Sequence, residues 1–324
     1  MKVLGIESTA HTFGVGIIKD KKILANVKDS YTTIKGGIIP IQAKEHHLRV
    51  GQKVIDDALI KADLTLKDID LISFSHSPGL APCLMVGVKF AKELKQKTNL
   101  PVVAVNHCIA HLEISKMTSS AKDPVLLYAS GANTQIIAFE SAKYRIFGET
   151  LDQGIGNFLD SFARHIGLGF PGGPKIQEIA SKSKNYIKLP YVVKGMDVSF
   201  AGILTNLKQK YDSKKYKIED LCYSAQENVF SMLIEVSERA IAHTGKKELV
   251  LGGGVACNTR LKEMASLMCK QRDAKCFIPD NSLLVDNGVM IAYSGLLKYK
   301  SNKKEDKIDF DPNLRTDSIE VTWH

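Results

Sequence analysis

Residues 2–19 are KVLGIESTAHTFGVGIIK. The two apolar runs in this stretch, Lys2–Glu7 and Thr12–Lys19, predict two strands, because Val and Ile fit the pleated, half-buried surface of a sheet. The polar residues Ser8–His11 between them predict a turn. The chain is therefore expected to open with a strand–turn–strand hairpin whose tip is small and polar.

The same pattern returns in the middle of the chain. Val125–Ala129 and Gln135–Phe139 predict another pair of strands around a small, polar turn. The stretch Met117–Ser120 just before it is polar and weakly structured, which is typical of a boundary between two parts of a chain. Two halves that each open with a hairpin predict a two-lobed molecule. We expect lobe I at residues 1–118, completed by residues 290–324, and lobe II at residues 119–289.

Predicted strands alternate with predicted helices in the rest of the chain. This order is typical of parallel α/β construction, so the predicted fold class is α/β, with a mixed sheet flanked by helices in each lobe. Further strands are expected at residues 23–29, 71–74, 102–105 and 248–251. Helices are expected at residues 46–62, 84–94, 157–168 and 289–297, and another, capped by Asn258 or Thr259, after the triglycine 252–254.

The composition is that of an ordinary globular protein of 324 residues, with 44% hydrophobic and 24% charged residues. A single compact core rarely serves a chain of this length, which agrees with two lobes. No apolar run reaches the roughly 18 residues that a membrane helix needs. The six cysteines form no Cys-x-x-Cys pair, which is typical of a reducing compartment. We therefore expect a cytoplasmic protein that does not act at a membrane.

The net charge of +9 is unevenly distributed. Between Lys182 and Lys217 the chain carries nine lysines against only Asp197 and Asp212. Such a stretch suits a nucleic-acid backbone, and interleaved aromatic side chains suit stacking on bases. A solvated surface without a partner has the same composition, so both interpretations stay open. The interleaved aromatic residues are Tyr186, Tyr191, Tyr211 and Tyr216.

His107 and His111 are four residues apart. On a helix they share a face, so both imidazoles could reach one ion, and neutral imidazole suits zinc or iron. Two ligands do not complete a site, and carboxylate or phenolate groups are candidates for the rest. The alternative is a pair of partly buried histidines satisfied by hydrogen bonds. A metalloprotease does not fit, because Cys108 stands where such enzymes carry the glutamate general base.

Three turns of small and polar residues could bind phosphate groups. Small residues let backbone N–H groups approach phosphate oxygens closely. The last of the three leads from a predicted strand into a helix N-terminus, which attracts negative charge. Together they predict a nucleotide site. The turns lie at residues 7–16, 130–135 and 252–258.

Two carboxylates stand near these turns. Asp160 lies in a predicted helix and could bind a hydroxyl of a ribose or of a substrate, although an ordinary surface or capping carboxylate would have the same pattern. Asp286 precedes the predicted helix at 289–297, and by its position alone it is predicted to be the N-cap of that helix.

In order and spacing these motifs resemble the actin, Hsp70 and sugar-kinase superfamily, with a phosphate hairpin in each lobe and a glycine-rich adenosine-binding segment late in the chain. More closely, the chain resembles the archaeal and eukaryotic tRNA threonylcarbamoyladenosine transferases, once described as O-sialoglycoprotein endopeptidases. The resemblance extends over nearly the whole chain, from Gly5 to Leu296. The segments that carry it are 5–12, 78–80, 106–111, 128–135, 196–205, 252–261 and 286–288.

The resemblance implies a set of site residues. It implies one metal ion per chain, with iron favoured and zinc as the alternative, held by His107, His111, Tyr128 and Asp286. It implies a phosphate loop formed by Glu7, Ser8, Thr9 and His11. It also implies a pocket for an adenine nucleotide, either threonylcarbamoyl-adenylate or ATP, with magnesium as a further ion. The residues implied to line the pocket are Tyr128, Ala129, Ser130, Gly131, Ala132, Asp160, Gly173, Gln177 and Asn258.

The resemblance also implies a reaction and partners. The enzyme would transfer threonylcarbamoyl from its adenylate to N6 of the adenosine beside the tRNA anticodon, with the metal as Lewis acid and without a protein nucleophile. Its relatives work with a small protein kinase/ATPase and small helper subunits in the KEOPS complex. No kinase signature stands in this sequence, so that kinase would be a separate chain.

Three residues depart from the usual family pattern. Ala132 stands in place of a second glycine, Gln177 in place of a frequent glutamate, and Ala201 in place of a frequent serine. None of them is an implied metal ligand, so we expect them to alter contacts in the pocket and to leave the metal site complete.

Two other functions fit parts of the sequence. A small-molecule kinase of the same superfamily would need an aspartate base and magnesium in place of a histidine-bound metal. A catalytically silent scaffold would resemble the shorter paralogues of the family, but these lack the paired histidines that this chain carries.

Overall fold

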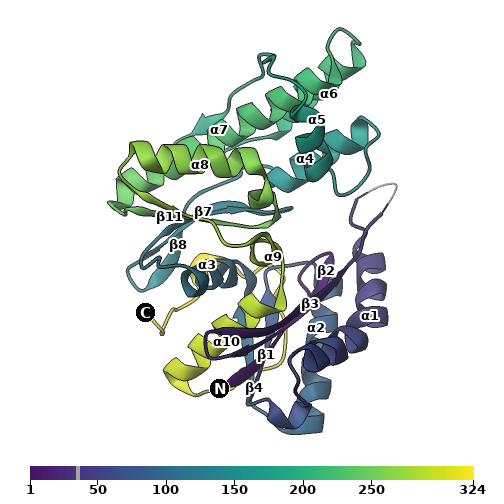
Figure 1. The fold of residues 1–324 in the computed structure, drawn as a ribbon, viewed down its shortest axis with the longest axis vertical. Coiled ribbons are helices and arrows are strands. Elements are labelled where there is room, and N and C mark those ends of the chain that lie inside the picture. Colours follow the sequence, from purple (N-terminus) through teal and green to yellow (C-terminus); the bar gives the residue numbers. More distant parts are fainter. Residues whose placement is uncertain (34–36) are drawn as a thin grey trace.

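The computed structural model describes residues 1–33 and 37–324. Within these residues the strands form two five-stranded sheets, one in the lower half of Figure 1 and one in the upper half, together with a small two-stranded ribbon. The first sheet has the order β3-β2-β1-β4-β5, and the second has the order β12-β11-β6-β7-β8. The strands are β1 (Lys2–Glu7), β2 (Thr12–Lys19), β3 (Lys22–Ser30), β4 (Leu71–Ser77), β5 (Val102–Asn106), β6 (Val125–Ala129), β7 (Thr134–Glu140), β8 (Lys143–Glu149), β9 (Val193–Lys194), β10 (Asp197–Val198), β11 (Glu248–Gly252) and β12 (Lys275–Phe277).

The two sheets have the same construction. Each begins with three antiparallel strands in sequence order, β1–β3 in one and β6–β8 in the other, and continues with two parallel strands on the other side of its first strand. Both expected hairpins and the parallel strands are thus confirmed. The mixed sheets follow from the chain's need to return through a helix before it can add a parallel strand.

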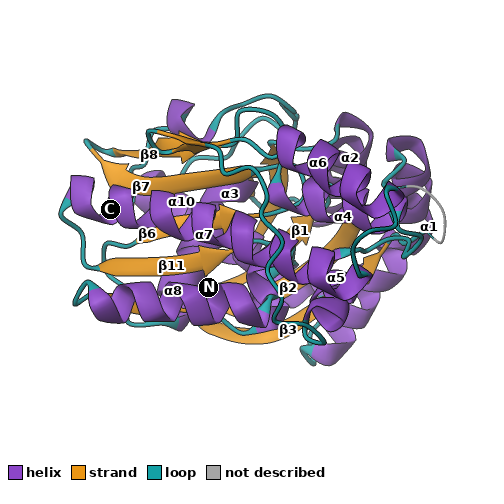
Figure 2. Cartoon of the chain, turned by 90° about the horizontal axis from the view of Figure 1, so that it is seen from above, coloured by secondary structure: helices purple, strands orange, loops and turns teal. Residues whose placement is uncertain are grey.

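Helices cover both sheets (Figures 1 and 2). α1 and α2 pack on one face of the first sheet and α10 on the other, while α7 and α8 pack on the second sheet. No helix in the described ranges is both long and apolar enough to span a membrane. The helices are α1 (Pro40–Lys61), α2 (Ala81–Thr98), α3 (His107–Thr118), α4 (Ile155–His165), α5 (Gly173–Ala180), α6 (Ala201–Asp212), α7 (Ile218–Thr244), α8 (Thr259–Gln271), α9 (Asn281–Leu284) and α10 (Gly288–Asn302), and short 3-10 turns lie at Leu66–Asp68, Gly254–Cys257 and Thr316–Ser318.

Helix α3 lies between the two sheets. Ala110 and Ile114 pack into the core that α10 forms with the first sheet. Ile109 and Leu112 pack into a core with the second sheet. Residues 107–115 are all buried, because both sides of the helix face a sheet. A helix in this position can present side chains to the junction of the two halves.

Helix α10 crosses strands β1 and β2 at very short range. A Cβ atom added to Gly16 would lie 2.1 Å from the backbone N of Val289, and one added to Gly288 would lie 2.0 Å from the backbone N of Gly16. Gly5 meets the same helix, with the backbone N of Ala292 at 2.3 Å from its added Cβ. Only glycine lets two backbones approach so closely. This crossing fixes the start of α10, and with it the position of Asp286.

The last residues, 303–324, form a tail that contacts both halves. Near its start, the N–H of Asp311 donates to the carbonyl of His76 in β4. Further on, Arg315 pairs with Glu149 in β8 at 3.1 Å. The tail therefore crosses from the first sheet to the second.

The structure differs from the sequence prediction at several elements. α1 begins at Pro40, six residues before the expected helix, because proline is well suited to the first turn of a helix. The strand β8 and the 27-residue helix α7 were not predicted. α10 continues to Asn302, five residues beyond the expected helix, and Lys298 in this extension pairs with Asp306 at 2.8 Å.

Candidate metal centre

Four side chains meet where α3, β6 and the start of α10 come together. Nε2 of His107 lies 3.0 Å from the hydroxyl of Tyr128 and 3.4 Å from Oδ1 of Asp286. Nε2 of His111 lies 3.4 Å from the same Oδ1. The ligand atoms of the two histidines and Asp286 all lie within 4.8 Å of one another. One ion at the centre of this cluster could contact all of them.

Two asparagine caps place these side chains. The side chain of Asn106 accepts from the N–H of Ile109 at 3.1 Å, so α3 begins at His107 and the two histidines project from successive turns. The side chain of Asn287 accepts from the N–H of Met290 at 3.0 Å and caps α10. The prediction that Asp286 caps this helix is therefore wrong. Because Asn287 caps the helix, the carboxylate of Asp286 can face the histidines.

The cluster fits a metal ion. Both ring nitrogens of His111 are buried and have no hydrogen-bond partner among the described residues. A buried polar atom without a partner is costly, and a coordinated cation removes that cost. Two imidazoles, a phenol and a carboxylate form a mixed nitrogen and oxygen ligand set, which suits iron or zinc. The one polar group near Nε2 of His111 is the carboxylate of Asp286, at the long distance of 3.4 Å, and Nδ1 has no partner among the described residues, so hydrogen bonds leave His111 poorly satisfied.

The electrostatics of the cluster favour a cation. Burial lowers the pKa of His111, so its imidazole is neutral and keeps a lone pair. Burial alone would raise the pKa of the Asp286 carboxyl, but the neighbouring His107 and His111 hold it well below its ordinary value. Burial raises the pKa of the Tyr128 phenol, which therefore keeps its proton unless a cation binds to its oxygen.

Glu7, expected in the phosphate loop, lies against the metal cluster. Its Oε2 lies 2.9 Å from Nδ1 of His107, and its Oε1 accepts from the N–H and the hydroxyl of Thr9 at 2.6 and 2.5 Å. Its side chain is fully buried. Sequence reasoning missed this contact, because 100 residues separate Glu7 from His107.

The other residues of the expected phosphate loop point in different directions. The backbone N–H of Ser8 donates to the hydroxyl of Ser75, and the Ser8 hydroxyl lies against Gly87 of α2. The ring of His11 meets the ring of Phe170 edge-on, with centroids 5.9 Å apart. His11 thus reaches the segment that follows α4, in the second half of the molecule.

The loop after β6 rests on the N-terminus of α4. The carbonyls of Ser130 and Gly131 accept from the N–H groups of Gly156 and Asn157, each at 2.9 Å. Gly253, with φ of +89°, lies against the carbonyl of Ala129, and a Cβ there would be 2.3 Å away. Gly131 and Ala132 are exposed at the tip of this loop. Tyr128, at the end of β6, joins the loop directly to the metal cluster.

Three further residues that were expected to line the nucleotide pocket have hydrogen-bond partners within the protein. Asp160 accepts from the N–H of Gly172 at 2.7 Å, and burial raises the pKa of its carboxyl. The side chain of Asn258 caps α8, with the N–H of Arg260 at 2.9 Å, as expected. The side-chain oxygen of Gln177 accepts from the N–H of Thr259 at 3.0 Å.

The remaining residues of interest lie at the starts of two helices. Gly173 begins α5, one residue after Gly172. Ala201, one of the three departures from the family pattern, begins α6, where its N–H donates to Asp152 at 2.9 Å.

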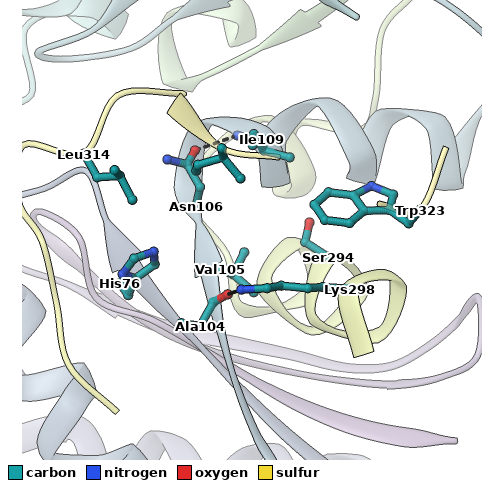
Figure 3. Close-up of a pocket in the computed structure, with 10 residues that line it drawn as sticks. His76, Ala104, Val105, Asn106, Ile109, Ser294, Lys298, Leu314 and Trp323 are labelled. Atoms are coloured by element: carbon teal, nitrogen blue, oxygen red, sulfur yellow. Dashed lines mark hydrogen bonds between the residues drawn. The ribbon is translucent and has the colours of Figure 1, made fainter. Parts of the chain in front are cut away.

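A separate cavity of about 240 Å³ lies next to Ile109 of α3 (Figure 3). It lies between β5, α10 and the tail, and contains none of the residues expected to line the nucleotide pocket. Its walls are mainly apolar, and the hydroxyl of Ser294, which lines it, has no hydrogen-bond partner in the described part of the chain. The residues that line it include Val105, Asn106, Ile109, Ser294, Lys298 and Trp323.

Comparisons with known proteins identify the family of the chain. The profile of the tRNA N6-adenosine threonylcarbamoyltransferase (TsaD) family matches residues 22–293. The tRNA N6-adenosine threonylcarbamoyltransferase of Thermococcus kodakarensis is 55% identical over 326 residues, which cover all of both chains. A probable bifunctional tRNA threonylcarbamoyladenosine biosynthesis protein of Methanosarcina mazei is 48% identical, over 99% of this chain and 59% of the longer relative.

Solved structures support the fold. The activator of 2-hydroxyisocaproyl-CoA dehydratase from Clostridium difficile, solved with bound ADPNP, superposes with a TM-score of 0.58 at 14% identity. The match covers 95% of this chain and 98% of the activator. The two-lobed α/β fold of the actin, Hsp70 and sugar-kinase superfamily is thus confirmed. The fold alone does not identify an activity, and the family follows instead from the length and the identity of the sequence matches. The chain belongs to the tRNA N6-adenosine threonylcarbamoyltransferase family.

Proposed function

We propose that this enzyme transfers the threonylcarbamoyl group from threonylcarbamoyl-adenylate to N6 of the adenosine adjacent to the tRNA anticodon, at a centre that holds one metal ion. The observation that carries the proposal is the buried cluster of His107, His111, Tyr128 and Asp286. In it, the two nitrogens of His111 have no hydrogen-bond partner within residues 1–33 and 37–324, and Tyr128 leads directly into a loop suited to phosphate. Either iron or zinc suits this ligand set, and we favour iron because a phenolate is a hard oxygen ligand.

The four ligands would hold the metal at the junction of the two halves. When bound there, the ion supplies a Lewis acid that polarises the carbamate carbonyl. Tyr128 is the second-last residue of β6, and Ala129–Ala132 follow it in the chain, so the acyl group would lie near the ligands when the loop holds the adenylate phosphate. The small residues of the loop leave its backbone accessible to the phosphate.

Other residues would hold the adenylate in place. Asp160, with its carboxyl fixed by the N–H of Gly172, is an acceptor for a hydroxyl group. Gln177 and Asn258 lie at the start of α8, whose N-terminus favours a negatively charged ligand, and Gly173 begins α5, the helix that carries Gln177. His11 would close the pocket from the first half of the molecule, since it already contacts Phe170.

The chemistry requires no protein nucleophile. The N6 amine attacks the carbamate carbonyl carbon, the new C–N bond forms, and the bond from that carbon to the AMP phosphate oxygen breaks. AMP leaves with the bonding electrons, and the amine gives up a proton to solvent. The protein contributes orientation of the two substrates and stabilisation of the developing negative charge.

We also propose partners beyond tRNA. The Methanosarcina mazei relative is named as bifunctional, and this chain accounts for 59% of its length. The rest of that relative is long enough for a second domain. We propose that the corresponding activity, a small protein kinase/ATPase, is a separate chain here, and that small helper subunits complete a KEOPS-type complex. We propose a cytoplasmic location and a division into lobes near residue 118.

The proposed metal centre is tested with purified full-length protein. We expect the wild type to bind close to one iron or zinc ion per chain, and His111→Ala to lose that ion and the transfer of threonylcarbamoyl to cognate tRNA together. His243→Ala is the matched control, because His243 is exposed on α7 and contacts none of the four ligands. Metal content is measured by mass spectrometry, and modified adenosine by nucleoside analysis of the tRNA. Full transfer activity in a metal-free His111→Ala protein would refute the metal-dependent mechanism.

A further inference from the structure

We propose that Glu7 is a positioning residue for the metal centre, and that its buried carboxylate fixes the tautomer and ring orientation of His107. The proposal rests on the proposed metal site and assigns to Glu7 a role different from phosphate binding.

The hydrogen bonds of His107 define one arrangement. Its Nδ1 lies 2.9 Å from a carboxylate oxygen of Glu7 and 3.2 Å from the hydroxyl of Thr9. A carboxylate oxygen without a hydrogen can only accept, and the single hydrogen of the Thr9 hydroxyl is already donated to the other oxygen of Glu7. Nδ1 therefore carries the hydrogen. In a neutral imidazole the other nitrogen then has a free lone pair, and Nε2 is the atom that faces Tyr128 and Asp286. Glu7 thus directs the lone pair of His107 toward the other ligands.

Glu7 is itself held firmly. It ends β1, where it pairs with Gly14 of β2. Its second oxygen accepts from both the N–H and the hydroxyl of Thr9, two residues later. The carboxylate is therefore fixed by the first hairpin and does not depend on α3 for its position. The bond from Glu7 to His107 joins that hairpin to the helix that carries both histidines.

The charge of Glu7 also points to the metal centre. The side chain is fully buried, and within the described residues its ion-pair partner is His107, with no lysine or arginine. A buried carboxylate needs a nearby positive charge. A cation on the far side of the His107 ring would supply it, and the carboxylate would in turn make the ring a stronger ligand.

The same contacts argue against a direct role of Glu7 in phosphate or magnesium binding. Both oxygens have hydrogen-bond partners inside the protein, and the side chain has no exposed surface. A phosphate would also be repelled by the carboxylate. The N–H groups of Ser8 and Thr9 in the turn after β1 already donate to Ser75 and Glu7, so His11 is the member of the expected phosphate loop that is left to contact a phosphate.

The proposal is tested by metal affinity and by the tautomer of His107. Zinc is titrated into the metal-free full chain against a chromophoric chelator, for the wild type and for Glu7→Gln, Glu7→Asp and Thr9→Val. Histidine side-chain nitrogens of the zinc-bound proteins are examined by ¹⁵N NMR. Glu113→Gln is the matched control, because Glu113 is a buried carboxylate on α3 that accepts from Trp323 and Tyr144 and does not contact His107.

We expect Glu7→Gln to weaken zinc binding by about 10- to 100-fold and to lose the uniform Nδ1–H form of His107. Glu7→Asp should restore part of the affinity, Thr9→Val should cause a smaller loss, and Glu113→Gln should bind zinc like the wild type. Wild-type affinity and an unchanged His107 spectrum in Glu7→Gln would overturn the proposal while leaving the metal centre intact. If Glu7→Gln does not fold, wild-type affinity in Thr9→Val would overturn it. A wild-type protein that binds no metal would refute the proposed metal centre instead.

Discussion

At the scale of single residues, two adjacent histidines in the first half of α1, His46 and His47, show how the turn at residues 8–11 is anchored to this helix. Nε2 of His46 lies 2.9 Å from Oδ1 of Asp29, and Nε2 of His47 lies 3.0 Å from the carbonyl oxygen of Ala10. Both Nε2 atoms face acceptors, so both carry hydrogen. The 3.3 Å contact between the two Nδ1 atoms is then a hydrogen bond only if one ring carries a second hydrogen. His47, whose Nε2 donates to the carbonyl of Ala10, is the ring that holds the turn at residues 8–11.

His47 makes the stability of the fold depend on pH. Burial lowers the pKa of His47 to about 4, against about 6.5 in the unfolded chain. Between these values the unfolded chain binds more protons, so the free energy of unfolding falls as the pH decreases from about 6.5 to about 4. The fall attributable to His47 is at most about 3 kcal/mol.

Urea unfolding at several pH values checks this expectation. The free energy of unfolding of His47→Gln should fall less steeply with decreasing pH than that of the wild type, because glutamine can still donate to Ala10 but does not titrate. The exposed His243, changed to Gln in the same way, should leave the slope unchanged. Equal slopes for His47→Gln and the wild type would show that another group dominates the acid sensitivity.

At the scale of secondary structure, the close crossing of α10 over β1 and β2 predicts a site that tolerates no added atom. Gly16→Ala should lower the free energy of unfolding by at least about 2 kcal/mol, because the methyl group would overlap the backbone of Val289. It should also weaken metal binding, since a displaced α10 carries Asp286 with it. Gly202→Ala is the control, because an added Cβ there meets nothing within 4 Å. Its stability should be unchanged or higher by up to about 1 kcal/mol. Thermal melting and zinc titration of both variants test the difference.

Several strands and helices of the fold could be predicted from the sequence, and their caps were harder to predict. The strands β1, β2, β6 and β11 were predictable because their residues are apolar, branched and bounded by polar turns. The spacing of His107 and His111 predicted that both lie on one face of a helix, and the family resemblance implied Tyr128 and Asp286 as the further ligands. The caps were harder: Asp286 and Asn287 are both good capping residues, and only the path of the chain over Gly16 decides that Asn287 takes the role. Asn106 stands directly before α3, and its capping role could have been predicted from the sequence.

Contacts between distant segments could not be predicted. Glu7 looked like part of a phosphate turn because it adjoins Ser8 and Thr9 in sequence. Its partner His107 is on another element, and nothing in local spacing joins the two. The long helix α7 has buried residues on several sides, so it lacks the single apolar stripe that identifies a surface helix.

At the scale of the whole molecule, the lysine-rich stretch 182–217 lies in the second half, around α5 and α6. Two of its aromatic rings have a lysine ammonium group above them. Nζ of Lys210 lies 4.9 Å from the ring centroid of Tyr216, and Nζ of Lys214 lies 4.3 Å from that of Tyr211. Tyr186 donates to Asn228 at 2.9 Å, so its ring is held in place. Ordered aromatic and cationic groups on an exposed surface suit a nucleic-acid backbone.

Charge reversal in this stretch tests its contact with tRNA. If it binds the backbone, the change should weaken binding to different tRNAs similarly and reduce the salt dependence of log Kd by about one unit per lost phosphate contact. Fluorescence anisotropy over a range of salt concentrations measures both. The variant changes three exposed lysines to glutamate, namely Lys184, Lys188 and Lys215. The control makes the same change at three exposed lysines of the first half, namely Lys21, Lys67 and Lys97. Equal effects of the two variants would indicate nothing more than general attraction by net charge.

The spread of the four ligands along the chain has a consequence for biosynthesis. His107, His111 and Tyr128 are made first, and Asp286 follows Tyr128 by 158 residues. A nascent chain that has not yet reached α10 therefore has an incomplete set of the proposed ligands, and α10, which positions Asp286, must dock before the set is complete. Insertion of the proposed metal would then follow folding and select chains already folded, in contrast to zinc fingers, whose folding the ion itself drives. The protein stripped of its metal should keep both sheets and accept the ion again without being refolded.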